Sequence, residues 1–286
     1  MLFYGSRISD RKSFASNIFL AQVELIPFIH RFPSVVRFRY QIPTMRLLPL
    51  VLAATMTTTP VLLLGQTFQD GIDAYDLKNY KTAAEIFLPL AEEGKAQAQY
   101  NLGVMYENGE GLPQDYAEAV KWYRLAAGQG NAAAQNNLGL LYNMGRGVPQ
   151  DDAEAVKWYR LAAEQGNVNA QFGLATIYHF GSISSSSGDG VAQNYERAVK
   201  WYRLAAEQGM SWAMSSLGHM YQIGEGVAQN FTNAYILYNL VAAQGGEYAR
   251  DNRDMAAEKL TPERLAEAQR LSSEWKVGEP LPLQGG

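Results

Sequence analysis

The sequence Lys121-Trp-Tyr-Arg-Leu-Ala-Ala127 occurs three times in this chain of 286 residues, beginning again at Lys157 and at Lys200. A glycine follows each copy, and such glycines recur at intervals of 36, 36, 43 and 36 residues: Gly94, Gly130, Gly166, Gly209 and Gly245. A fixed period of a few tens of residues indicates that one supersecondary unit is repeated and that each copy buries its apolar side against the next. The sequence therefore predicts one continuous array rather than a globular core.

Each copy contains a segment with the apolar spacing of a first helix. In residues 98–106 the apolar positions are i, i+4, i+7 and i+8, occupied by Ala98, Leu102, Met105 and Tyr106. The segment recurs at 134–142, 170–178 and 213–221. Glycines beside this stripe allow a neighbouring element to approach closely, and we interpret them as packing residues: Gly103, Gly139 and Gly218.

A turn and a second helix follow each first helix. The turn at 109–113 contains two glycines and a proline, which permit a positive φ and end the first helix. Asp115 with Glu118, and Asp151 with Glu154, have the spacing of capping boxes that open a second helix.

Large aromatic residues recur on the apolar face of the second helix. Trp122 and Tyr123 lie at i+3 and i+4 from Ala119. A tryptophan ladder that stacks on sugars or bases is conceivable, but each indole buries 150 to 250 Å² when packed, which favours a core position for Trp122, Trp158 and Trp201.

Taken together, the motifs Ala-x-x-x-Leu-Gly-x-x-Tyr, Gly-x-Gly-Val and Ala-x-x-Trp-Tyr-x-x-Ala-Ala-x-x-Gly resemble those of the Sel-1-like repeat family, relatives of the tetratricopeptide repeats. The resemblance covers residues 95–245 as four units. It implies an all-α, right-handed superhelix (solenoid) of antiparallel helix pairs whose first helices line the concave side. It also implies adaptor work, in which the protein assembles other proteins into complexes.

The flanking segments are interpreted from the same pattern. Residues 67–94 predict a leading, degenerate helix pair, and residues 246–276 predict C-terminal capping helices, the last of which starts at Thr261-Pro262-Glu263. End units have a neighbour on one side only, so they differ from the internal repeats. Residues 277–286 are expected to be a tail.

The N-terminal region predicts export. Residues 45–66 contain a short basic start, an apolar stretch and small or polar residues, which is the form of a signal peptide. A retained anchor is the alternative, although the prolines and threonines of this stretch make a poor bilayer span. Residues 1–44 are Arg-rich and patterned for neither helix pairs nor a sheet, so we expect a disordered, over-extended start, with a mitochondrial targeting peptide as the alternative. The expected location is the periplasm or the exterior of a bacterium.

Composition argues against several functions. The chain has no cysteine, which excludes disulfides, thiolate metal sites and a cysteine nucleophile. After residue 66 there are 17 basic and 26 acidic side chains, so a nucleic-acid groove is not expected in the folded part. His179 and His219 occupy different helical phases and have no third partner, so no metal is expected. We expect no cofactor.

The stretch Ser273-Glu-Trp-Lys276 matches the Ser-x-x-Lys pattern of penicillin-recognising enzymes. It lies in a terminal helix, and the chain has no companion Ser-Asp-Asn or Lys-Thr-Gly element. We interpret the match as a coincidence and expect no enzymatic activity.

Positions at which the four copies differ are the best candidates for partner recognition, because stacking does not fix them. On the first-helix face away from the apolar stripe, the residues change from mainly polar to aromatic along the array. Aromatic residues and methionine are enriched in interface cores. The predicted partner-binding residues are Tyr100, Asn136, Leu140, Met144, Phe172, Thr176, His179, Phe180, Trp212, Ser215, His219 and Gln222. The alternative is an ordinary surface with one partly buried aromatic residue.

The sequence thus favours an exported, non-enzymatic scaffold that binds a peptide or helix of a partner protein on its concave face. Two alternatives remain: an accessory factor of the cell wall or of polysaccharide export, and a β-lactam-interacting enzyme. The sequence does not indicate the identity of the partner or the oligomeric state.

Overall fold

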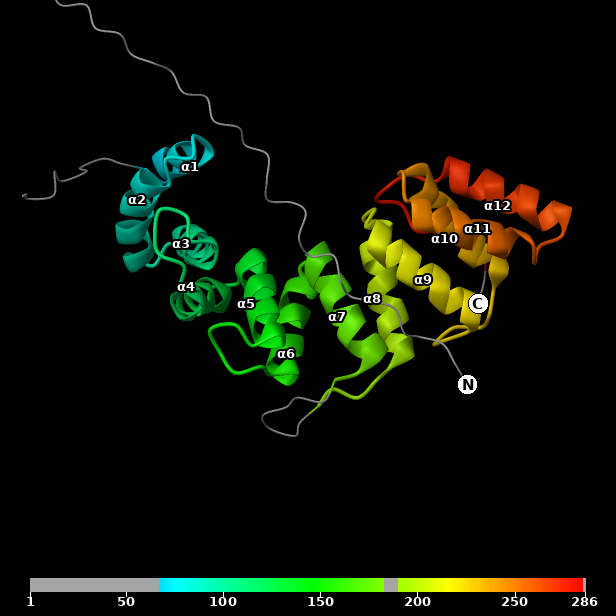
Figure 1. Ribbon diagram of the computed structural model, residues 1–286, viewed down its shortest axis with the longest axis horizontal. Helices are drawn as coiled ribbons and strands as arrows, with labels where there is room; N and C mark the ends of the chain where they lie inside the picture. Colours follow the sequence, from blue (N-terminus) through cyan, green and yellow to red (C-terminus); the bar gives the residue numbers. More distant parts are fainter. Residues whose placement is uncertain (1–66, 183–189, 285–286) are drawn as a thin grey trace, which may run out of the picture. The chain divides into compact units, whose positions relative to one another are not determined.

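A computed structural model describes residues 67–182 and 190–284 of the chain (Figure 1). The predictions made for residues 1–44 and 45–66 lie outside the described residues. Within the described ranges the chain forms α-helices and, apart from an isolated bridge between Ser182 and Val191, no β-structure. The helices are, in chain order, α1 (Phe68–Asp76), α2 (Tyr80–Glu92), α3 (Ala96–Asn108), α4 (Tyr116–Gly128), α5 (Ala132–Met144), α6 (Asp152–Glu164), α7 (Val168–Phe180), α8 (Tyr195–Glu207), α9 (Ser211–Ile223), α10 (Phe231–Ala243), α11 (Glu247–Ala257) and α12 (Pro262–Glu274).

The helices pack in sequence order (Figure 1). Within a repeat the first helix contacts the second, as α3 contacts α4, and the second helix contacts the first helix of the next repeat, as α4 contacts α5. The last helix departs from this order, because α12 packs on α10. The prediction of an all-α repeat superhelix is confirmed. None of the described helices is long and apolar enough to cross a membrane.

Glycines in the left-handed conformation end most of the first helices. Gly109, Gly145 and Gly224 have φ values of 73°, 64° and 82° at the C-caps of α3, α5 and α9. A side chain is disfavoured at such a φ, which explains the glycine in each turn. At Gly111 a Cβ would also overlap the backbone of Tyr80, so this turn lies directly against the start of the preceding second helix.

The second helices of the four repeats begin at side-chain caps, but the predicted capping boxes are wrong. The Asp115 carboxylate accepts hydrogen bonds from the backbone N–H groups of Ala117 and Glu118, and Asp151 accepts one from Glu154. The reciprocal bond from the glutamate is absent, because Glu118 pairs with Lys121 at 3.1 Å and Glu154 pairs with Lys157. An ion pair one helical turn away thus replaces the second half of the box.

The two helices of a repeat touch through a tyrosine ring that lies on a glycine. A Cβ added to Gly103 would lie 2.6 Å from the ring of Tyr123, and one added to Gly139 would lie 2.9 Å from the ring of Tyr159. In the fourth repeat the corresponding distance from Gly218 to the ring of Tyr238 is 3.0 Å. The interpretation of these glycines as packing residues is confirmed.

The tryptophans lie on the packed side of the second helices to different extents. Trp122 is 7% exposed, whereas Trp158 and Trp201 are partly buried against the core. The predicted core position is therefore confirmed for Trp122, whereas Trp158 and Trp201 are only partly buried. The indole N–H groups of Trp122 and Trp158 are buried without a hydrogen-bond acceptor in the described part of the chain.

We predict that Gly103→Ala destabilises the protein by about 1–2 kcal/mol, because the new methyl group overlaps the fully buried ring of Tyr123. The free energy lost through this overlap exceeds the free energy gained from the higher helix propensity of alanine. Gly128→Ala is the matched control. Gly128 is also helical, but a Cβ there meets no atom within 4 Å, so alanine should be neutral or stabilise by up to about 1 kcal/mol. Urea unfolding of both variants tests this, and equal stabilities would contradict the packing role.

Candidate functional site

A groove with a volume of about 720 Å³ opens between the C-terminal end of α7, the exposed side of α9, the end of α10 and the start of α11. We call it the aromatic groove. Three large side chains on it are exposed to solvent: Phe180 (70%), Trp212 (75%) and Tyr248 (76%). Large aromatic side chains contribute most when they are buried, so their exposure at one groove marks a surface suited to binding.

Two of these aromatic residues occupy the same position of successive repeats. Trp212 is the second residue of α9, and Tyr248 is the second residue of α11, 36 residues later. The equivalent residues of the earlier first helices are small or polar: Gln97, Ala133 and Asn169. Stacking of repeats does not require an aromatic residue at this position, so the aromatic pair is particular to this end of the array.

The first helices that lead to the groove carry no formal charge. No Asp, Glu, Lys or Arg occurs in α5, α7 or α9, whereas the second helices α4, α6 and α8 each carry several. Among the described residues that line the groove, Glu247 is the only Asp, Glu, Lys or Arg. Depletion of charge together with enrichment of aromatic residues is the composition of a protein interface core.

The groove brings together some of the residues predicted from sequence. Five of them line it: His179, Phe180, Trp212, Ser215 and His219. The other predicted residues lie outside its lining: Tyr100, Asn136, Leu140, Met144, Phe172, Thr176 and Gln222. Of these, Leu140 and Met144 are exposed on α5, and the rest are half-buried.

Three of the residues outside the lining take part in packing between helices. The ring of Phe172 lies 5.7 Å from that of Tyr202, and the Thr176 hydroxyl lies 3.4 Å from the Tyr202 hydroxyl. The Gln222 side chain accepts a hydrogen bond of 2.9 Å from the Tyr238 hydroxyl. These three side chains therefore contact neighbouring helices rather than the groove.

His179 is buried beneath the rim of the groove. Its ring stacks on Phe180 with centroids 4.4 Å apart, its Nδ1 lies 3.4 Å from the Tyr202 hydroxyl, and its Nε2 lies 3.4 Å from the Glu225 carboxylate. Burial lowers the pKa of His179 below its ordinary value of 6.5, an effect that Glu225 opposes and His219 reinforces. His179 therefore fixes the position of Phe180 mainly as a neutral ring.

Residues that sequence reasoning missed include Tyr248, Gln244 and Asn252. The signal for Tyr248 was available, because it lies one period after Trp212, but α11 lacks the repeat motif and was interpreted only as a cap. Gln244 and Asn252 are residue types that also occur at the same positions of other repeats. Only their surroundings in the fold distinguish them from those other residues.

The surroundings of Gln244 differ because a hydrogen-bond ladder ends there. In earlier repeats a buried glutamine of the first helix accepts a bond from the glutamine that closes the second helix, as Gln99 does from Gln129 at 2.7 Å. Gln135 and Gln171 repeat the arrangement with Gln165 and Gln208. Met214 occupies this position in the fourth repeat, and the carbonyl oxygen of the Gln244 side chain accepts from the Ser211 hydroxyl instead. The Gln244 amide nitrogen has no acceptor among the described residues.

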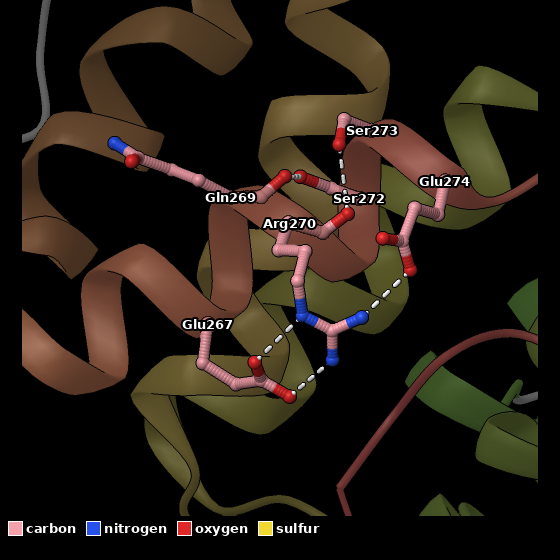
Figure 2. A network of polar contacts seen from close by, with 6 residues as sticks. All are labelled: Glu267, Gln269, Arg270, Ser272, Ser273 and Glu274. Atoms are coloured by element: carbon pink, nitrogen blue, oxygen red, sulfur yellow. Dashed lines mark hydrogen bonds and ion pairs between the residues drawn. The ribbon is translucent and has the colours of Figure 1, made fainter.

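Among the described residues, no serine of the groove is hydrogen-bonded to a histidine. Ser215 and His219 lie one helical turn apart in the groove, but no hydrogen bond joins them in residues 67–182 and 190–284. At the Ser-x-x-Lys match on α12, the Ser273 hydroxyl donates to the Arg270 carbonyl of its own helix (Figure 2). The described residues contain no group of three His, Cys, Asp or Glu side chains that could hold a metal ion.

The fold and the groove define the class of protein: an all-α repeat superhelix with a neutral, aromatic surface on its first helices. Comparison with known protein families identifies the family to which the chain belongs. The model of the Sel1 repeat matches residues 96–131, 132–167, 168–210 and 213–246, which is more than half of the chain. The protein belongs to the Sel1 repeat family, whose members are generally protein-interaction scaffolds.

The solved structures similar to this chain include two repeat proteins of bacteria. A Sel1 repeat protein from Oxalobacter formigenes is 31% identical, with a TM-score of 0.61 over 73% of this chain and 85% of that one. A protective antigen present in uropathogenic Escherichia coli strains, described as displaying an SLR fold, is 35% identical, with a TM-score of 0.59 over 75% of this chain. The chain spans about half the length of that second protein (50%). No match was found among curated proteins.

Phe172 and Phe180 should respond differently to truncation. Phe172→Ala is predicted to lower the free energy of unfolding by about 2 kcal/mol, because its ring packs against Tyr202 in the core. Phe180→Ala should change it by less than about 0.5 kcal/mol, because 70% of Phe180 is exposed. Thermal or urea unfolding measures both, and a large loss for Phe180→Ala would show that this residue belongs to the core.

The lowered pKa of His179 predicts that stability depends on pH. As the pH falls below 6.5, the unfolded chain binds a proton at this histidine before the folded protein does, so the free energy of unfolding decreases with falling pH. In His179→Gln the part of this decrease in unfolding free energy that comes from protonation of His179 should disappear. This holds whatever the absolute stability of the variant. Unfolding curves at about pH 7 and about pH 5 test the difference, and parallel losses in both proteins would refute it.

Proposed function

We propose that this protein is an exported, non-enzymatic scaffold that holds a segment of a partner protein in the aromatic groove, on what would be the concave side of the superhelix. The observation that carries the proposal is the exposure of Phe180, Trp212 and Tyr248 around one groove. Membership of the Sel1 repeat family supports a scaffold role in general.

The composition of the lining supports a protein partner. Its other residues are mostly serine, glycine and carboxamide side chains, with one carboxylate from Glu247. Tyrosine and tryptophan supply contact area at a low entropic cost, and serine, glycine and asparagine supply adaptable hydrogen bonds, which is the chemistry of natural protein-binding surfaces. A volume of about 720 Å³ can take a few side chains of a partner rather than a whole domain.

Export is supported by the sequence of residues 45–66, which has the form of a signal peptide. The periplasm or the exterior of a bacterium is therefore the compartment in which we expect the partner. Fractionation of cells that express the full chain tests this part of the proposal independently of the groove.

The double variant Phe180→Ala/Trp212→Ala should lose its partner. We expect the amount of partner recovered by cross-linking in the native compartment to fall by about tenfold or more, because aromatic anchors in a groove dominate binding energy. Leu125→Ala/Leu161→Ala is the matched control, since these side chains are 47% and 45% exposed on α4 and α6, away from the groove. Equal recovery by both variants would refute the groove as the binding site.

The sequence leaves two alternative functions: a cell-wall or polysaccharide-export accessory factor and a β-lactam-interacting enzyme. Stable purification in a stoichiometric assembly would favour a subunit of a cell-wall or polysaccharide-export complex. Covalent labelling of Ser273 by a β-lactam would favour a β-lactam-interacting enzyme, but the Ser273 hydroxyl donates to the Arg270 carbonyl of its own helix (Figure 2).

A further inference from the structure

Two tyrosine rings of the array are covered by arginines of the same chain. The Arg146 guanidinium lies over the ring of Tyr116, 5.5 Å from its centroid, and the Arg197 guanidinium lies over the ring of Tyr178 at 5.4 Å. In both pairs the arginine and the tyrosine belong to different elements. A cation over an aromatic face is attracted by the negative charge of the ring's π-system. This array therefore uses guanidinium groups to cover aromatic faces.

The three exposed rings of the aromatic groove have no such cover. Among the described residues, no lysine or arginine lies over Phe180, Trp212 or Tyr248, and none lines the groove. Arg250 follows Tyr248 by two residues in α11, but residues two apart do not share a face of a helix. The groove thus presents aromatic faces, and within the described ranges the chain supplies no cation to them.

Negative charge also lies at the groove. Glu247, which lines it beside Tyr248, is exposed and forms no ion pair with any described residue. The Glu225 carboxylate lies 3.4 Å from Nε2 of His179 at the rim, and burial keeps that histidine mainly neutral by lowering its pKa. His179 therefore does little to compensate Glu225. Charge complementarity favours a cation in the groove.

Two helix N-termini at the groove act in the opposite sense. α9 begins after Met210 and α11 begins after Gly246, and neither helix has a side-chain cap. A helix N-terminus carries about half a positive charge, which favours an anion. At α11 the full negative charge of Glu247 in the first turn exceeds this partial charge. A cation is therefore favoured beside Tyr248, and an acidic ligand is the alternative that an experiment must separate.

Arginine fits these groups better than lysine does. Its guanidinium is planar and weakly hydrated, stacks on aromatic faces and can pair with a carboxylate through two parallel N–H groups. The lysines that lie over rings in this chain, Lys121 and Lys200, directly precede their tryptophans in the same helix. Both cation–ring contacts between separate elements use arginine.

We propose that the aromatic groove binds an arginine side chain of the partner protein, whose guanidinium lies against the exposed rings of Trp212 and Tyr248 and pairs with the Glu247 carboxylate. This inference rests on the proposed function and goes beyond it by naming the chemical group that anchors the partner. It assigns Glu247 to recognition of that group.

The experiment begins with a library of random peptides displayed on phage and selected on the purified full chain. Peptides that lose binding to Trp212→Ala are counted as groove ligands. We expect these peptides to share an arginine and to be poor in Asp and Glu. Replacement of that arginine by citrulline, which has nearly the same shape without the charge, should weaken binding by about tenfold. Lysine in its place should weaken binding by about threefold, because it keeps the charge but not the planar group.

Two substitutions of Trp212 separate a cation–ring contact from a general apolar contact. Trp212→Phe keeps an aromatic face, whereas Trp212→Leu keeps apolar area without a ring. We expect Trp212→Phe to bind the arginine peptides within about threefold of the natural protein and Trp212→Leu to bind them about tenfold more weakly. Since 75% of Trp212 is exposed, neither substitution should change Tm appreciably.

Glu247→Gln tests the carboxylate, with Glu196→Gln as its matched control. Both glutamates are exposed in the first turn of a helix, α11 and α8, so both substitutions remove the same interaction with a helix N-terminus. Glu247→Gln should weaken the arginine peptides by about threefold and reduce the salt dependence of their binding. Glu196 lies outside the lining, so Glu196→Gln should change neither. The citrulline peptide should bind both variants equally.

The results distinguish this inference from the proposed function. If no selected peptide depends on Trp212, both fail. If peptides depend on Trp212 but share no arginine, carry an acidic anchor or tolerate citrulline, the groove remains the binding site and only this inference fails. Equal binding by Trp212→Phe and Trp212→Leu, or by Glu247→Gln and Glu196→Gln, also overturns it. If the protein self-associates and Trp212→Leu abolishes the association, the occupant is a second copy and the inference is wrong.

Discussion

The contact between the tyrosine of each second helix and the first helix of its own repeat is the constraint on which the array depends. Tyr123, Tyr159, Tyr202 and Tyr238 are all at most 4% exposed, and a helix can approach such a ring closely only where it has little or no side chain. This explains Gly103, Gly139 and Gly218 in three repeats and the small Ala175 in the other. Since an aromatic ring contributes much of the area buried in so small a unit, the helix pair depends on this contact.

Once the pairs are formed, hydrogen bonds join one repeat to the next. Arg124, Arg160 and Arg203 each donate to the hydroxyl of a tyrosine 18 residues later, at 2.7–2.8 Å. The series ends in α10, where Asn239 takes the arginine position and donates to Ser272 of α12 at 2.8 Å. Ile236, at the position of the exposed Lys121, is fully buried in α10. The last second helix thus has an apolar outer face, because α12 covers it where no further repeat follows.

The same repetition explains how one end of the array acquired a binding surface. The second helices α4, α6 and α8 carry charged side chains and the first helices α5, α7 and α9 carry none, so these first helices can vary without disturbing the ion pairs. Trp212 of α9 and Tyr248 of α11 bring two aromatic rings to a single groove. Among the described residues, this groove lies at the repeat in which Met214 interrupts the ladder of Gln99, Gln135 and Gln171.

The sequence by itself determined the period, the helix pairs, the packing glycines and the end of each first helix, because these follow from local spacing and from backbone conformations that glycine adopts most readily. It also identified Phe180 and Trp212 as variable aromatic residues on the first helices. Only the tertiary structure decided that Phe172 packs against Tyr202 while Phe180 is exposed, and that Tyr248 lies beside Trp212. It alone showed that Glu118 pairs with Lys121 rather than with the helix cap. These outcomes depend on which neighbour lies within hydrogen-bond or van der Waals distance in three dimensions, which residue spacing along the chain does not specify.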